Sequence, residues 1–234
     1  MAAKVAKEVV PGLYSIKAGV ANAFLIDAGD AGLTLVDAGY AKNAGDIEAG
    51  IRSIGREPSD LTDILITHAH PDHLGSAAHL SAGVVPVSLP ADEAWIAKAG
   101  RYEVTTKPIP GVFNKIMFRF LIGSKPYEFP AFEPQRGLSG GENLDIAGGI
   151  EVVHTPGHSA GHMSLLWKND RNVLFTGDAV VNAMGLGYAV GYEDFETGKQ
   201  SAVNLAQLDF EVAVFGHGKP LLSNASSKFA KKFH

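Results

Sequence analysis

Residues 68–73 read HAHPDH, and this segment carries the strongest signal in the chain. It directly follows the run ILIT at residues 64–67, which we expect to be a short buried strand. Imidazole nitrogens and a carboxylate are suitable ligands for zinc, manganese or iron, and a turn at a strand end can point alternate side chains into one space. The candidate metal ligands of this segment are His68, His70, Asp72 and His73.

Six residues cannot surround a metal ion, so further ligands must come from elsewhere in the chain. Three candidates each follow a predicted strand and lie beside glycine: His158, Asp178 and His217. A lone histidine is usually an ordinary core or surface residue. Here five of the nine histidines lie at predicted strand ends, where loops present functional groups on a rigid scaffold. The pattern therefore indicates one shared metal site.

In this order, the residues resemble the metallo-β-lactamase superfamily, whose pattern is His-x-His-x-Asp-His followed by His, Asp and His at strand ends. The match extends over nearly the full length of the chain. The resemblance implies an α/β (α+β) fold, a four-layer αββα sandwich of two similar halves, with a binuclear site at one edge. It implies one set of ligands for each ion and one bridging residue: His68, His70 and His158; Asp72, His73 and His217; and Asp178 as the bridge.

Two divalent cations held in this way lower the pKa of a shared water, so that a metal-bound hydroxide exists near neutral pH and can act as the nucleophile. One ion can polarise the substrate oxygen while the other stabilises the leaving group. Asp72 is expected to orient the water or to move a proton. The expected cofactors are two Zn²⁺ ions, with iron or manganese as alternatives.

The apolar patterning predicts a mixed α/β chain that forms a single domain over residues 1–234. Strands are expected at residues 9–16, 24–27, 33–37, 64–67, 84–87, 150–153, 164–167, 173–175 and 212–215. Helices are expected at residues 42–55, 199–207 and 223–233, with an Ala-rich helix that ends near Gly83. The first three strands should form an antiparallel meander.

Residues 104–134 differ in composition from the rest, because they hold five of the 12 prolines and six of the 20 aromatic residues. We interpret them as a subregion inserted in the domain. Its apolar side chains between Phe113 and Ile122 fall on one helical face. Such a helix covers the core in most proteins, and the alternatives are a lid, a substrate wall or the contact of a homodimer.

Composition excludes several classes of protein. The 20 Lys and Arg against 25 Asp and Glu give a net charge of −5 without a basic block, which argues against a nucleic-acid partner. The absence of cysteine excludes disulfides and thiolate metal sites. We find no segment with the roughly 18 apolar residues of a membrane helix and no secretory signal, so a cytoplasmic protein is expected.

The expected function is hydrolysis of a carbonyl ester, lactone or thioester in a small-molecule substrate. Lactone hydrolases of the superfamily often carry a tyrosine where this chain has Val181, and the glutathione-thioester hydrolases add a helical domain that 17 residues after His217 cannot build. Secreted β-lactamases with this motif usually lack the bridging aspartate. Two rival hypotheses are a mononuclear iron persulfide dioxygenase and a non-enzymatic metal-dependent binding protein.

A few further residues are weaker candidates. Asp37 ends a predicted strand and is either support for a ligand histidine or a turn residue. His154 and His162 are expected to make local hydrogen bonds, and His79 is expected at the surface. Glu142 and Tyr188 are within possible reach of the pocket, but no pattern places them there.

Overall fold

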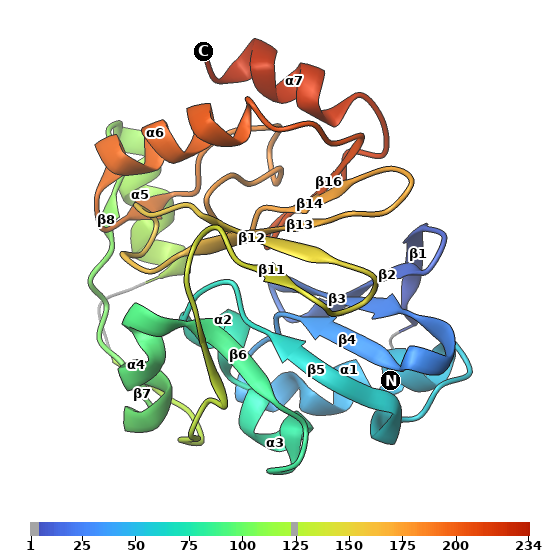
Figure 1. Ribbon diagram of the computed structural model, residues 1–234. Helices are drawn as coiled ribbons and strands as arrows, with labels where there is room; N and C mark the ends of the chain where they lie inside the picture. The colour runs from blue at the N-terminus through green and yellow to red at the C-terminus, as the bar shows by residue number, and fades with distance from the viewer. Residues whose placement is uncertain (1–4, 123–125) are drawn as a thin grey trace.

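The computed structural model describes residues 5–122 and 126–234, and two β-sheets lie face to face at its centre (Figure 1). Within the described residues the first sheet contains, in spatial order, β1 (Lys7–Val10), β2 (Leu13–Ala18), β3 (Ala21–Asp27), β4 (Leu33–Val36), β5 (Leu61–Leu65), β6 (Val87–Pro90) and β10 (Arg136–Leu138). The second contains β11 (Asn143–Leu144), β12 (Ile150–His154), β13 (Met163–Trp167), β14 (Val173–Phe175) and β16 (Val212–Val214).

Helices cover the outer face of each sheet (Figure 1). The first sheet carries α1 (Ala44–Ser53), α3 (Ala77–Ser81) and α4 (Ala94–Ala99), and the second carries α6 (Phe195–Leu205) and α7 (Ala225–Lys232). The short helix α2 (Pro71–Leu74) follows β5 at the edge of the first sheet. The expected four-layer αββα sandwich is confirmed. No helix in the described part of the chain has the length and apolar character needed to cross a membrane.

Side chains packed between the two sheets hold the strands, and so the points at which the loops begin, in fixed positions. Phe24 of β3 contacts Phe175 of β14 edge to face, with ring centroids 5.6 Å apart. β4, β13 and β14 are buried at every position. Close packing of this kind leaves little freedom to the residues that immediately follow a strand. The loops after β5, β14 and β16 therefore start from fixed points.

Several boundaries differ from those predicted. The expected strand 9–16 is two antiparallel strands, because Pro11 and Gly12 form a turn in which Gly12 has a φ of +76°. The strand expected at 84–87 begins only at Val87. Helix α6 begins before residue 199, because the Asp194 carboxylate accepts a hydrogen bond from the Thr197 N–H at 3.0 Å and caps it. The Ala-rich helix expected to end near Gly83 is α3, which ends at Ser81, and a separate short helix, α2, forms within the preceding His-rich turn.

The subregion of residues 104–134 contains β8 (Lys107–Pro108), α5 (Val112–Leu121) and β9 (Tyr127–Glu128), while residues 123–125 lie outside the described part. β8 pairs with β15 (Gly191–Tyr192), and β9 pairs with β7 (Arg101–Tyr102). Helix α5 is where the pattern placed it. Its side chains are largely exposed, however, so it does not cover the core as such helices usually do.

Candidate metal centre

The HAHPDH segment follows β5 and enters helix α2. Pro71 occupies the first helical position, where its fixed φ suits a helix start and its missing N–H is not needed. His68 and His70 therefore lie on the loop, while Asp72 and His73 lie on the first helical turn. This change of backbone direction lets one short segment contribute ligands to more than one group.

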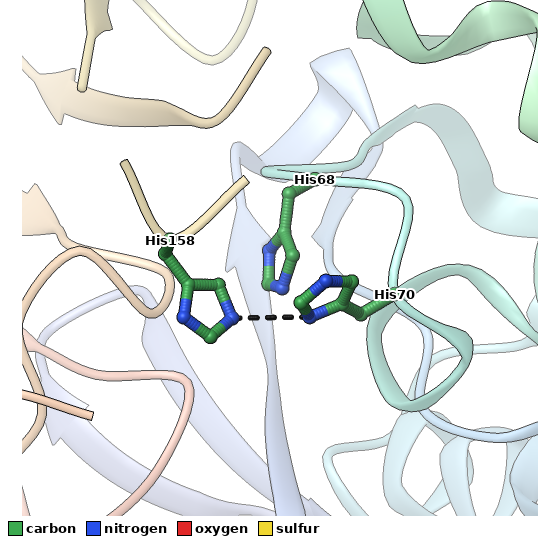
Figure 2. Close-up of side chains that lie close together, drawn as sticks. All are labelled: His68, His70 and His158. Carbon is green, nitrogen blue, oxygen red and sulfur yellow. Dashed lines mark hydrogen bonds between the residues drawn. The ribbon is translucent and has the colours of Figure 1, made fainter. Parts of the chain in front are cut away.

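One group joins this loop to the loop between β12 and β13. The potential ligand atoms of His68, His70 and His158 all lie within 4.8 Å of one another. Figure 2 shows the three rings turned toward a common point, with His158 Nε2 3.0 Å from His70 Nδ1. Two residues 88 positions apart in the sequence thus face each other through ring nitrogens.

A second group consists of Asp72, His73 and His217, whose ligand atoms also lie within 4.8 Å of one another. Asp178 lies between the two groups. Its carboxylate oxygens are 3.6 Å from His73 Nε2, 3.6 Å from His158 Nε2 and 3.1 Å from His217 Nε2. The structure therefore brings together all seven residues that the sequence singled out.

Four of the five histidines have one ring nitrogen fixed by an acceptor outside the centre. The Nδ1–H groups of His73, His158 and His217 donate to Asp37 Oδ2 (2.8 Å), the Gly191 carbonyl (2.8 Å) and the Val20 carbonyl (3.1 Å), respectively. His68 Nδ1 lies 3.0 Å from Thr67 Oγ1, which itself donates to Asp37. These bonds fix the proton on Nδ1, so each Nε2 can present a lone pair to the centre once it carries no proton of its own.

The inward-facing atoms fit a metal ion because the chain does not satisfy them. His68 Nε2, His73 Nε2 and Asp178 Oδ1 are buried and find no hydrogen-bond partner among the described residues. Buried polar atoms in native proteins are normally paired, and orphaned lone pairs from imidazole and carboxylate are the donor set of zinc, iron and manganese sites. The observation supports the use of these residues as ligands.

His70 differs from the other histidines. It faces His158 through Nδ1, and its far nitrogen, Nε2, has no partner among the described residues. Its ring packs against Tyr102, with centroids 4.6 Å apart. Among the described residues, none outside the centre forms a hydrogen bond that would fix the orientation of the His70 ring.

The charges around the centre shift several pKa values in opposite directions. Burial lowers the pKa of His68, His70 and His158. Burial also acts to lower the pKa of His73, but the carboxylates of Asp37, Asp178 and Asp72 outweigh it and raise that pKa to about 9.

The two carboxylates of the centre are ionised for the same electrostatic reason. Burial acts to raise their pKa values, but His73 and His217 lower the pKa of Asp72 to about 2 and hold that of Asp178 well below its usual range. Asp178 in turn raises the pKa of His217 against the effect of burial. The metal-free chain thus carries protons on His73 and His217, where bound cations would replace them.

Asp37 is support for a ligand histidine, one of the two roles that its position suggested. It has a φ of +59°, which is uncommon for a residue other than glycine. Its side chain accepts from His73 Nδ1–H, from the Thr67 backbone N–H at 2.9 Å and from the Thr67 hydroxyl. One buried carboxylate therefore orients the residues at both ends of the HAHPDH segment, His73 directly and His68 through Thr67.

The histidines outside the ligand set behave as expected. His162 Nε2 accepts the Asp178 backbone N–H at 3.0 Å, and its Nδ1 lies 2.8 Å from Thr155 Oγ1. His154 Nε2 lies 3.4 Å from the Ala160 carbonyl, and His79 is exposed beside Glu48 at 3.0 Å. His162 thus holds the backbone of a candidate ligand without facing the centre as a ligand itself.

Glu142 and Tyr188, the two residues that no pattern placed, make their contacts away from the centre. Glu142 forms an ion pair with Arg136 at 2.7 Å. Tyr188 packs against the aromatic rings of Tyr192, Phe195 and Phe233.

Sequence reasoning missed residues that hold the loops of the centre. Asn22 donates from Nδ2 to the carbonyls of Phe215 (2.8 Å) and Gly218 (3.0 Å), on either side of His217. Glu93 is a buried carboxylate that accepts hydrogen bonds from two ligand-bearing loops. Neither lies in a motif, and only the tertiary structure brings them to the centre.

Comparison with known proteins agrees with this geometry. A sequence model of the metallo-β-lactamase superfamily matches residues 16–217. Among solved structures, the MIM-2 metallo-β-lactamase superimposes with a TM-score of 0.72 at 18% identity, covering 98% of this chain and 86% of that one. At this identity, the likeness concerns the fold alone.

Curated relatives carry several names. The lactamase-like protein aptB of Emericella nidulans is 28% identical over 68% of this chain and 39% of its own length. The thioesterase pkgB of the same organism is 29% identical over 70% of this chain and 36% of its own length. Hydroxyacylglutathione hydrolase GloC of Haemophilus influenzae is 28% identical over 74% of this chain and 76% of its own length. The chain thus spans about two fifths of the length of the first curated relatives it matches.

Proposed function

Because the chain belongs to the metallo-β-lactamase superfamily, we propose that it is a metal-dependent hydrolase that cleaves a carbonyl ester, lactone or thioester. A single observation carries this proposal. Histidine nitrogens without hydrogen-bond partners among the described residues point to one place, and the other ring nitrogen of these histidines is held by a hydrogen bond. An arrangement in which ligands are oriented before the ion arrives is typical of metal sites.

In this proposal two ions are held by the two groups of residues. His68, His70 and His158 hold one ion, Asp72, His73 and His217 hold the other, and Asp178 is shared. Five imidazoles and two carboxylates suit Zn²⁺ best, and iron or manganese are the alternatives. When bound, such ions supply a water of lowered pKa and a Lewis acid for the substrate carbonyl oxygen.

The residues of the chain divide the remaining work. Asp178 is almost fully buried, whereas the side chain of Asp72 is 17% exposed. Asp72 Oδ2 lies 3.4 Å from His217 Nε2, and the pKa of about 2 keeps the carboxylate ionised at neutral pH. We assign Asp72 to accepting a hydrogen bond from the attacking water and orienting it. Asp72→Ala should therefore lose most turnover while the fold survives.

A thioester is the preferred bond class. Relatives that match most of this chain are named for thioester substrates, including pkgB and the hydroxyacylglutathione hydrolases. The apolar helix α5 lies beside the centre, because a Cβ built on Gly191 would come within 2.7 Å of the Phe118 ring, and the Gly191 carbonyl accepts from His158. An apolar wall there suits an acyl chain.

We further propose that residues 104–134 act as a lid or substrate wall within a single domain. Support comes from Glu193, which accepts hydrogen bonds from Thr105 and from the Ala160 N–H in the loop that carries His158. The same subregion exposes Val112, Phe113 and Phe120, which would be the contact of a homodimer.

The deciding experiment measures metal content and turnover on the same protein, purified without added metal. Mass spectrometry of the metals should give two zinc ions per chain, and a panel of thioesters and lactones with matched acyl chains should be hydrolysed. His158→Ala should lose both properties, while the control His79→Ala, which changes an exposed histidine, should lose neither.

Three results would replace the proposal. One iron per chain, with oxygen consumption on a persulfide and no hydrolysis, would establish a dioxygenase. Turnover of a β-lactam above that of every thioester and lactone would establish a lactamase. A wild-type chain that binds no divalent ion would remove the hydrolase proposal altogether.

A further inference from the structure

Glu93 places a buried carboxylate between two loops of the candidate metal centre. It follows β6, directly before α4, and is 4% exposed. Its Oε2 accepts the backbone N–H of Ala69 at 2.5 Å, and its Oε1 accepts the backbone N–H of Gly161 at 2.9 Å and the Ser159 hydroxyl at 2.5 Å. Ala69 separates His68 from His70, and Ser159 follows His158.

We propose that Glu93 is the positioning residue for the ion held by His68, His70 and His158. Its carboxylate joins the loop after β5 to the loop after β12 and so sets the distance between the ligands that each loop carries. This inference rests on the proposed function, because it concerns the affinity of the same centre for metal. It adds a residue that makes no contact with the ion itself.

The need for such a residue comes from His70. The far nitrogens of His73, His158 and His217 donate to acceptors outside the centre, whereas His70 Nε2 has no partner among the described residues. Ligand histidines are usually oriented through that second nitrogen. The His70 carbonyl accepts the N–H groups of His73 at 2.9 Å and Leu74 at 3.0 Å, so helix α2 holds the C-terminal side of this residue. On its N-terminal side, the hydrogen bond from the Ala69 N–H to Glu93 holds the backbone.

Only a carboxylate satisfies this arrangement. Each of its oxygens accepts a backbone N–H, from Ala69 on one side and Gly161 on the other, and a backbone N–H cannot become an acceptor. A glutamine has one acceptor oxygen, so its amide N–H₂ would face one of these two donors. Glu93→Gln therefore keeps the shape of the side chain and breaks one of the two loop contacts.

Gly161 leaves room for the Glu93 side chain. A Cβ added at Gly161 would lie 2.8 Å from Glu93 Cγ, so a side chain at that position would push the carboxylate away. No ion pair joins Glu93 to a cationic side chain in the described part of the chain, and its three hydrogen bonds oppose, without cancelling, the rise in its pKa that burial causes. A buried unpaired carboxylate adds little to stability, which favours a role in holding the loops.

The test is a calorimetric titration of metal-free protein with Zn²⁺, repeated with Co²⁺ to record the absorption bands of each site. In Glu93→Gln, we expect the affinity for one ion to fall by about 10- to 100-fold, as is usual when a group that orients ligands is lost. Binding of the second ion should stay within about twofold of the wild-type value, and only one set of Co²⁺ bands should change.

Two further variants keep the test decisive. Glu133→Gln removes an exposed glutamate that pairs with Lys98 of the neighbouring α4 at 2.7 Å, and it should bind both ions as the wild type does. Ser159→Ala removes only the hydroxyl contact, so it should weaken the same ion as Glu93→Gln by a smaller factor. If Glu93→Gln fails to fold, the zinc affinities of Ser159→Ala test the proposal in its place.

The inference is overturned if Glu93→Gln and Ser159→Ala bind both ions as tightly as the wild type. It is also overturned if both ions weaken equally, because that result describes a general loosening of the fold. If the wild type binds no divalent ion, the proposed function fails and this inference fails with it. If the wild type binds two ions and the variants do not differ, only the role of Glu93 is lost.

Discussion

The candidate metal centre and helix α5 are neighbours, but their side chains are packed very differently. The rings of His68 and His73 are fully buried, and their outward-facing nitrogens have hydrogen-bond partners. On α5, by contrast, Phe113 is 58% and Phe120 81% exposed. The contrast separates two tasks. The core of the sandwich fixes the candidate ligands, whereas the helix beside them leaves much of its apolar surface exposed.

The strongest test of this contrast is Asp178→Ala. The substitution removes the carboxylate that faces His73, His158 and His217, so both ions should bind poorly. We expect turnover to fall by about a thousandfold or more, as for other groups that stabilise charge at the reacting atoms. Metal content and kcat/KM measure the effect. Asp170→Ala, in the exposed turn between β13 and β14, is the control, and equal loss in both variants would contradict the assignment.

The pH dependence of the metal-free chain tests how the centre is charged. His73 has a folded pKa of about 9 against 6.5 in a model peptide, so its stabilising effect is complete below pH 6.5 and is lost as the pH rises through 9. For His73 alone, this amounts to about 3 kcal/mol of unfolding free energy. Urea unfolding at a series of pH values measures it.

His217 shifts in the same direction, so zinc binding at pH 7 should release protons from both residues. Calorimetry in buffers of different ionisation enthalpy counts those protons. A metal-free chain whose stability rises steadily from pH 7 to pH 9.5 would show that His73 is not protonated. Activity should also fall below about pH 6, because protons then compete with the metal ions for the ring nitrogens of the ligand histidines.

Asp37→Asn sharpens the comparison within the centre. The amide would place an N–H₂ group against either Thr67 N–H or His73 Nδ1–H, both of which need an acceptor. The ion held with His73 should bind about 10- to 100-fold more weakly. Because Asp37 also holds His68 through Thr67, the ion held with His68 should weaken as well, by a smaller factor. Zinc titration should therefore distinguish this variant from Glu93→Gln, in which only the ion held with His68 is expected to weaken. Asp30→Asn, in an exposed turn, should bind both ions normally.

Phe118→Ala addresses the other region. Loss of this ring beside Gly191 should lower kcat/KM for long acyl chains by about 10-fold, the worth of an apolar contact, and leave short chains unchanged. Metal content should equal that of the wild type. Phe113→Ala, on the exposed face of the same helix, serves as the matched control. A uniform loss over all chain lengths would place Phe118 in the support of the centre.

The smallest change is expected from Phe120→Ser. This side chain is 81% exposed, so the unfolding free energy should stay within about 0.5 kcal/mol of the wild-type value. If residues 104–134 form the contact of a homodimer, sedimentation should show weaker self-association. A large loss of stability in a monomeric protein would mean that α5 is packed more firmly than its exposure indicates.

The sequence singled out seven residues that the structure brings together, because their chemistry is unusual and their order is distinctive; that they hold metal stays a prediction. It also predicted the sandwich, since the family resemblance is confirmed by the match over residues 16–217. It could not predict Glu93, whose role depends on hydrogen bonds to residues 24 and 68 positions away. For the same reason it allowed two roles for Asp37: a single aspartate at a strand end has no signature until the fold shows its partners.

Strand and helix ends were less predictable than their existence. Pro11 and Gly12 interrupt an apolar run that otherwise reads as one strand, and the cap at Asp194 starts α6 earlier than its apolar pattern does. The exposure of α5 could not be predicted from the sequence either, because an amphipathic pattern is the same whether the apolar face packs on a core, a ligand or another chain.

The hydrogen bonds of Asn22 join segments that are far apart in the sequence, since its partners Phe215 and Gly218 lie 193 and 196 residues away. During synthesis the β2–β3 hairpin emerges before the loop with His217, which cannot reach it until residue 218 has been made. Contacts between such distant segments carry a large loop-closure cost and form late in folding. Under the proposed function, the ion held with His217 is therefore expected to be acquired late in the maturation of this protein, after the HAHPDH loop is already in place.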